Sequence, residues 1–180
     1  MAQRRNGVQA LTAAEGVVVV DVPPEERPSL EKILEESFEG WYLRHSKGKL
    51  LQLEVVRAAM SSGAPVGLVM LKTLEPRVGY IYYIAVAKAH RRVGIARLLL
   101  EDSLRHFREG GVDVVFAGVE TGNVPSEGLF ASEGFTRTGF GDVSKRFGTI
   151  RAVNMYRMMV IVPGEALMWK KISRQPSPSD

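Results

Sequence analysis

Two apolar segments that flank one amphipathic helix constrain the fold of this chain more than any other feature of the sequence. GYIYYIAV (residues 79–86) is typical of a buried strand, and VDVVFAGVE (112–120) is apolar enough for a strand covered on both faces. Residues 94–109 carry apolar side chains at helical spacing, and Gly110-Gly111 ends that helix. Strand, helix and strand together predict a right-handed parallel crossover.

Three β-rich segments, 51–60, 65–73 and 79–87, lead up to this crossover. Short turns, SSGA and LEPRVG, join them, so they predict an antiparallel meander. A further strand is expected at VVVVDV from Val17, followed by one or two helices, the first of which Ser29 could cap. The sheet must be mixed, because it would contain both antiparallel and parallel neighbours.

The C-terminal third continues with short elements. SEGLFASE predicts a short helix, Gly134-Phe135 ends it, and a strand follows. GFGDVSKRFG (139–148) is interpreted as a polar loop, and AVNMYRMMVIV (152–162) predicts the last strand. The predicted fold class is therefore α/β with an α+β mixed sheet: a central, mostly antiparallel sheet flanked by helices, with one parallel β-α-β crossover.

Length and composition predict one soluble domain. The chain has 180 residues, of which 45% are hydrophobic and 24% charged, as is usual for globular proteins. We expect a single domain over residues 17–172, a flexible segment at 1–16 and a disordered, low-complexity tail at 173–180. No apolar run reaches the roughly 18 residues of a membrane span, and the N-terminus lacks the apolar region of a signal peptide, which predicts a cytoplasmic protein without membrane attachment.

The side chains that are missing exclude several kinds of chemistry. The sequence contains no cysteine, so disulfides, thiolate metal sites and acyl-cysteine intermediates are excluded. Its three histidines, His45, His90 and His106, do not have the spacing of metal ligands, and no metal is predicted. The formal charge of +4 would suit an anionic ligand or nucleic acid, but solubility explains it equally well.

The turn HRRVGIA, at the start of the crossover helix, is a candidate phosphate site. A helix start exposes unpaired N–H groups and the positive end of the helix dipole. Gly94 and Ala96 would let a phosphate approach the backbone, while Arg91 and Arg92 would add charge. The alternative is a plain strand–helix turn with surface arginines. The P-loop and dinucleotide-binding patterns are absent, and GFGDVS has a serine where the third glycine would stand, with no helix expected after it.

This stretch resembles motif A of the GNAT superfamily of N-acetyltransferases, whose loop reads [R/Q]-x-x-G-x-[G/A]. Arg91, Arg92, Val93, Gly94, Ile95 and Ala96 fill that loop. A second family motif is matched by Asn123, Ser126, Leu129-Phe130 and Gly134-Phe135 at the family's spacing. The close resemblance covers roughly residues 79–135, and the order of elements from Val17 to Val162 is also similar.

The resemblance implies a GNAT-like fold that binds acetyl-CoA. Backbone amides around Arg92 to Arg97 would hold the pyrophosphate, and the backbone of Ile84 and Val86 would pair with the pantetheine arm as an added strand. Asn123 would reach the same arm, although an Asn in a turn after a strand is the ordinary alternative. The implied cofactor-binding residues are Ile84, Ala85, Val86, Arg91, Arg92, Val93, Gly94, Ile95, Ala96, Arg97, Asn123, Ser126 and Phe130.

The sequence departs from the family where many members carry catalytic groups. Phe130 stands in place of a tyrosine, Gly118 in place of a carboxylate, and Tyr80 in place of a glutamate found in other members. Candidate replacements are Glu120, on the same strand face as Gly118, together with Tyr156 on the predicted last strand and Tyr82. A solvated strand end for the glutamate, and core packing for the tyrosines, are the alternatives. A further alternative is that no residue acts as a strong acid and that positioning of the two substrates accounts for the rate.

The resemblance implies an N-acetyltransferase that passes the acetyl group of acetyl-CoA directly to a primary amine, which would be a peptide or protein N-terminus, a lysine or a small amine. Trp41, Tyr42, His45 and the loop at 139–151 would surround the acceptor, unless the aromatic residues only pack. Two alternatives remain open: a catalytically weak acyl-CoA-binding sensor or structural subunit, and a basic nucleic-acid-binding domain. No helix-turn-helix or zinc finger supports the second alternative. A homodimer is left open.

Overall fold

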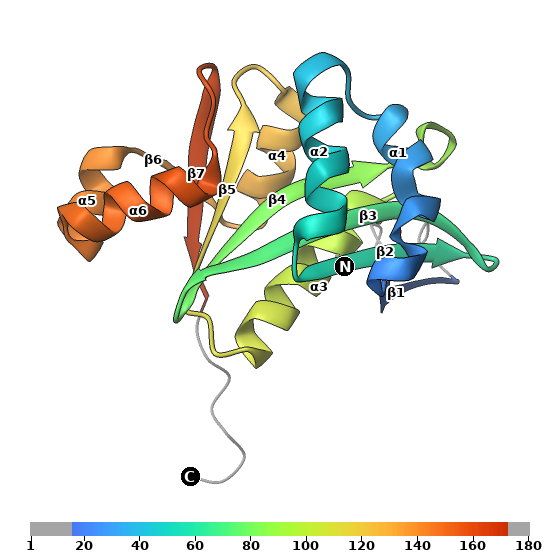
Figure 1. Cartoon of the computed structure of the whole chain (residues 1–180), viewed down its shortest axis with the longest axis horizontal. Helices are drawn as coiled ribbons and strands as arrows, with labels where there is room; N and C mark the ends of the chain where they lie inside the picture. Colours follow the sequence, from blue (N-terminus) through green and yellow to red (C-terminus); the bar gives the residue numbers. More distant parts are fainter. Residues whose placement is uncertain (1–15, 173–180) are drawn as a thin grey trace, which may run out of the picture.

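The computed structural model describes residues 16–172, in which a seven-stranded mixed sheet forms the centre of the fold (Figure 1). Its strand order is β1-β2-β3-β4-β5-β7-β6, and only β4 and β5 run parallel to each other. The predicted flexible segment, apart from Gly16, and the predicted disordered tail lie outside the described residues. The strands are β1 Val17–Asp21, β2 Val55–Ser61, β3 Ala64–Glu75, β4 Val78–Val86, β5 Val114–Glu120, β6 Thr136–Thr138 and β7 Glu165–Lys171.

Helices cover both faces of the sheet and bury one apolar cluster on each (Figure 1). Apolar side chains of α3 and α4 belong to the cluster on one face, and those of α1, α2, α5 and α6 to the cluster on the other. No helix within the described residues is long and apolar enough to cross a bilayer. The helices are η1 Pro24–Leu30, α1 Glu31–Glu35, α2 Gly40–Gln52, η2 Lys88–His90, α3 Ile95–Glu109, α4 Val124–Ser132, α5 Phe140–Phe147 and α6 Thr149–Met159.

The predicted crossover is confirmed: α3 connects β4 to β5, and these two strands pair in parallel. Its apolar face is buried against the sheet because the apolar residues recur at helical spacing. On the same helix Asp102 is buried, with 1% of its side chain exposed, and it accepts a hydrogen bond of 2.6 Å from Nε of Arg57 on β2. Arg105 also pairs with Asp102. This buried ion pair fastens α3, and with it the turn that starts at Gly94, to the sheet.

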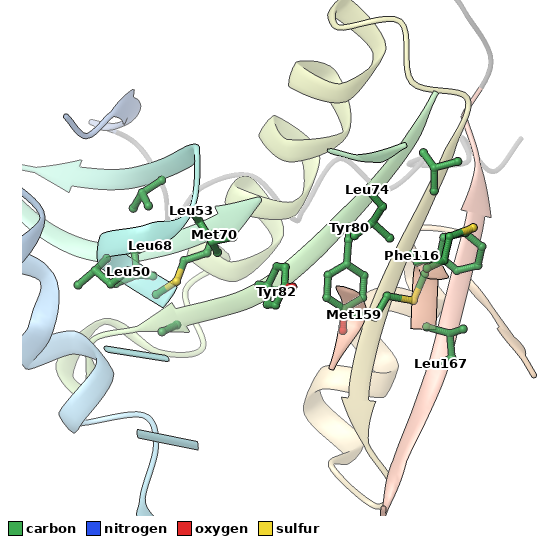
Figure 2. Packing of buried hydrophobic residues seen from close by; sticks show 14 of the residues in the cluster. Leu50, Leu53, Leu68, Met70, Leu74, Tyr80, Tyr82, Phe116, Met159 and Leu167 are labelled. Atoms are coloured by element: carbon green, nitrogen blue, oxygen red, sulfur yellow. The ribbon is translucent and has the colours of Figure 1, made fainter. Parts of the chain in front are cut away.

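A β-bulge in β4 changes which side chains face which cluster. The pairing of β3 with β4 passes from Met70 opposite Tyr83 to Leu71 opposite Ile81, so Tyr82 is an extra residue. An extra residue in a strand changes the sheet face to which the neighbouring side chains point. Here Tyr82 and Tyr83 both pack in the cluster that contains Tyr80. Figure 2 shows Tyr80 and Tyr82 between two groups of buried residues, Leu50, Leu53, Leu68 and Met70 on one side and Phe116, Met159 and Leu167 on the other.

The predictions for the C-terminal third are partly wrong. The expected polar loop at 139–148 is α5, so a helix does follow the start of GFGDVS, and the expected last strand at 152–162 is α6. Ala152, Met155 and Met159 of α6 recur at helical spacing, and all three are buried. The last strand is instead β7, whose EALMWKK has weak strand propensity and forms a strand because β5 and β6 pair with it from both sides.

Two smaller expectations near the N-terminus are also corrected. Ser29 does not cap a helix: its hydroxyl donates to the carbonyl of Glu26, and the N-cap of α1 is Leu30. The strand expected to begin at residue 51 begins at Val55, because α2 extends to Gln52.

The contact between α3 and β4 leaves no room for a side chain at Gly79. A Cβ there would lie 2.7 Å from Cε1 of Phe107, so we expect Gly79→Ala to lower the free energy of unfolding by about 1–3 kcal/mol through overpacking. Gly48→Ala is the matched control, because Gly48 lies within α2 and a Cβ there meets nothing within 4 Å. That change should stabilise the protein by up to about 1 kcal/mol. Urea unfolding measures both, and equal effects would contradict the packing argument.

Candidate active site

The two parallel strands separate after only four residue pairs. Their register runs from Val78 opposite Val114 to Ile81 opposite Ala117 and stops there, although both strands continue. A cavity of about 220 Å³ lies at the separation. Its lining includes residues of β4 (Tyr82, Tyr83, Ile84, Val86), β5 (Gly118, Val119, Glu120) and α4 (Ser126, Leu129, Phe130), together with Ser37, Phe38, Tyr42, Ala96, Asn123 and Glu165.

The N-terminus of α3 opens onto this cavity, because Ala96 in its first turn is part of the lining. The N-cap is Gly94, whose φ of 87° is left-handed and therefore suits glycine. A Cβ on Gly94 would meet nothing within 4 Å, so the backbone is open to a ligand. No side chain caps this helix start, which leaves its amide groups for an external acceptor. The turn has the features of an anion site.

The arginines of the turn have different roles. Arg91 is held by the protein: its Nε donates to the carbonyl of Val86 at 3.0 Å, and its Nη2 donates to the carbonyl of Glu36 at 2.6 Å. Arg97 donates to the hydroxyl of Ser132 on α4. Arg92 is exposed and adopts a left-handed φ of 67°. Arg91 therefore braces the turn against the end of α1, and Arg92 remains exposed to provide charge.

The second predicted motif forms the opposite wall. The Asn123 side chain accepts a hydrogen bond of 3.2 Å from the backbone N–H of Ser126, and so it caps α4. Phe130 is buried and packs edge-on against Phe135, with ring centroids 5.0 Å apart. The structure thus brings Ile84, Val86, Ala96, Asn123, Ser126 and Phe130 to one cavity. The side chains of Ala85 and Ile95 lie in the two apolar clusters.

Of the three predicted catalytic residues, two line the cavity. Glu120 is exposed at the end of β5, and Tyr82 lines the cavity, with its hydroxyl donating to the carbonyl of Met158. Burial raises the pKa of Tyr82. Tyr156 lies on α6 rather than on the last strand, packs edge-on against Phe140, and is not part of the lining.

Sequence reasoning missed three residues of the site or gave them little weight: Glu165, Tyr83 and Tyr42. Glu165 begins β7, where no strand was expected, and its Oε1 accepts a hydrogen bond of 3.1 Å from the hydroxyl of Tyr42. Burial and the nearby Glu165 carboxylate raise the pKa of Tyr42 to about 12. The same two causes raise the pKa of Tyr83, whose hydroxyl lies 2.7 Å from Nδ1 of His45. The sequence indicated Glu165 only indirectly, because a glycine at position 118 leaves space for a carboxylate from another strand.

The described residues contain no group of three or more His, Cys, Asp or Glu side chains that could hold a metal ion. The main feature of the site is a sheet that opens between two parallel strands beside the uncapped start of α3 at Gly94. The family model described as the acetyltransferase (GNAT) family matches residues 20–135. The chain belongs to the GNAT acetyltransferase family. This membership makes it an acyltransferase.

Solved GNAT structures share its fold across almost the whole chain. The ribosomal-protein-S18-alanine N-acetyltransferase from Escherichia coli is 15% identical with a TM-score of 0.67, covering 90% of this chain and 97% of that one. The IAA acetyltransferase from Bacillus cereus is 20% identical with a TM-score of 0.65, covering 87% and 99%. The PaiA N-acetyltransferase from Thermoplasma acidophilum, solved in complex with coenzyme A, is 14% identical with a TM-score of 0.66, covering 87% and 99%. No curated protein sequence matches this chain.

Proposed function

We propose that the protein is an N-acetyltransferase that transfers the acetyl group of acetyl-CoA to a primary amine. The observation that carries this proposal is the cavity between the separated strands β4 and β5, which reaches the uncapped N-terminus of α3. An extended thioester-bearing arm fits a gap between strands, and a pyrophosphate fits a helix start. The coenzyme A in the PaiA structure and the alanine acceptor in the S18 enzyme's name support this substrate pair.

Backbone rather than side chains would hold most of the acetyl-CoA. The amides from Arg92 to Arg97 would bind the pyrophosphate, with Arg92 supplying exposed charge. Beyond Ile81, β4 has no strand partner on its β5 side among the described residues, so Ile84 can pair with the pantetheine arm as a neighbouring strand would. Asn123, Ser126 and Phe130 would close the other side of the arm.

Transfer would be direct, because the chain has no cysteine that could carry the acetyl group. The amine must be neutral when it attacks, so a carboxylate near the thioester has to accept its proton. Glu120 and Glu165 are the two carboxylates of the cavity, and Tyr82 and Tyr83 are its hydroxyl groups from β4. The packing of Tyr156 against Phe140, outside the lining, gives no support to a role for Tyr156 in proton transfer.

Calorimetric titration with acetyl-CoA tests the proposal, with adenosine and a short DNA duplex as controls. We expect saturable binding of acetyl-CoA and none of either control. An amine panel then tests transfer: an alanine-initiated peptide, an N-terminally blocked lysine peptide and spermidine. Release of coenzyme A can be followed with a thiol reagent. The protein itself does not react with this reagent, because it has no cysteine. Binding of the duplex instead of acetyl-CoA would refute the proposal.

A further inference from the structure

Gly118 lies where β5 borders the cavity, and the space next to it is already filled by a carboxylate. A Cβ built on Gly118 would lie 3.2 Å from Oε2 of Glu165 and 2.9 Å from the hydroxyl of Tyr80. Glu165 is directly opposite Glu120 in the pairing of β5 with β7, so Gly118 is its diagonal neighbour on the same sheet face. The side chain of Glu165 therefore reaches across from β7 to the β5 position that has no side chain.

Two hydrogen bonds hold this carboxylate in place. Its Oε1 accepts from the hydroxyl of Tyr42 on α2 at 3.1 Å, and its Oε2 accepts from the backbone N–H of Val162 at 3.2 Å. Each carboxylate oxygen accepts one of these bonds and so keeps a lone pair for a further proton donor. Glu165 is half-buried and lines the cavity, whereas Glu120 at the strand end is exposed. Of the two carboxylates, Glu165 is the one that is held in a fixed position.

We propose that Glu165 is the general base of this acetyltransferase, acting on the acceptor amine from the cavity wall beside Gly118. This inference rests on the proposed function. The Glu165 carboxylate takes one proton from the acceptor ammonium. The freed nitrogen attacks the thioester carbonyl, a C–N bond forms and the C–S bond breaks. The departing sulfur takes a second proton from the nitrogen, and Glu165 returns its own proton to water.

The charged and titratable groups around Glu165 favour this role. Burial raises the pKa of Glu165 above its usual value, and the Glu120 carboxylate raises it further, while the bonds from Val162 and Tyr42 oppose this. A higher pKa makes the carboxylate a stronger base. Tyr80 and Tyr83 on β4 also face it, and burial together with the Glu165 charge raises the pKa of both. They and Tyr42 therefore stay protonated near neutral pH. The carboxylates of Glu165 and Glu120 are then the proton acceptors of the cavity lining, and Glu165 is the one held by hydrogen bonds.

Glu165→Gln is the test, with turnover measured on the best amine of the panel and acetyl-CoA affinity measured by calorimetry. We expect kcat to fall by about 10²–10⁴-fold while acetyl-CoA binds as tightly as before. The wild-type rate should fall as pH drops through the raised pKa of Glu165, since only the carboxylate accepts a proton. The glutamine variant should lose this decline and keep only the pH dependence that protonation of the acceptor amine itself causes. Glu165→Asp, which keeps the charge on a shorter arm, should restore part of the rate.

Glu101→Gln is the matched control, because Glu101 is exposed on α3 and does not line the cavity. It should leave both readouts unchanged. A larger loss of kcat in Glu120→Gln than in Glu165→Gln, or an unchanged pH profile in Glu165→Gln, would overturn the assignment and leave the proposed function intact. Failure of wild-type protein to bind acetyl-CoA, or to acetylate any amine of the panel, would overturn both together.

Discussion

Replacing Gly94 with glutamate should weaken the binding of acetyl-CoA by at least about 100-fold, which corresponds to about 2.7 kcal/mol. The added carboxylate would stand at the helix start where the pyrophosphate is expected, so two negative charges would compete for the same amides. A second cost comes from the backbone, because φ at this residue is 87° and side chains other than glycine are strained there. Calorimetry with acetyl-CoA measures the loss.

Gly94→Asn separates the two causes of this loss. Asn tolerates a left-handed conformation better than other residues and carries no charge, and a Cβ at this position meets nothing within 4 Å. The asparagine variant should therefore lose much less affinity than the glutamate variant. Both should lower the melting temperature by only a few degrees, because the left-handed φ costs about 1–2 kcal/mol and a Cβ at Gly94 meets nothing within 4 Å. Unchanged affinity in Gly94→Glu would contradict the proposal that the pyrophosphate binds at the start of α3.

Asp102→Ala should lower the free energy of unfolding by about 3–5 kcal/mol, because it leaves the Arg57 guanidinium largely buried without its main partner. The Asp102 side chain is 1% exposed and that of Arg57 is 15% exposed. Removing the carboxylate also releases Arg105, which pairs with its other oxygen. Urea unfolding followed by circular dichroism provides the measurement.

Asp21→Ala is the matched control for this variant, because Asp21 pairs with the same arginine from an exposed position. Its side chain is 74% exposed, and its Oδ1 lies 2.6 Å from Nη1 of Arg57. An exposed pair of this kind contributes about 1 kcal/mol or less. The double variant Arg57→Leu with Asp102→Leu should recover much of the stability, since both charges are removed together. Similar losses for Asp21→Ala and Asp102→Ala would show that burial does not set the strength of this pair.

The sequence was most informative where a motif coincided with strong periodicity. The segment from Gly79 to Glu120 predicted the strands, the helix and the turn at Gly94, because local pattern and fold agree there. The C-terminal third was predicted poorly, because Met155 and Met159 suit either a strand or a helix. The position of β7 depends on its neighbours β5 and β6 rather than on its own residues.

The same difference explains which site residues were found. Gly94 and Asn123 belong to segments whose spacing is visible along the chain. Glu165 enters the cavity from a strand that sequence reasoning had placed elsewhere, and its relation to Gly118 exists only across the β5–β7 pairing. Tyr83 faces the site because of the bulge at Tyr82, and the register shift that creates it depends on the partner strand β3.

The early end of the β4–β5 ladder has a consequence for solubility. A sheet that opens in its middle has internal edges, and unpaired strand edges can recruit any extended chain, including that of another molecule. The outer strand β1 adds a second such edge, with Val18 and Val20 exposed on it. A substrate that lies along β4 would also shield this internal edge. Concentrated stocks of the enzyme should therefore aggregate more slowly when they are stored with coenzyme A than without it.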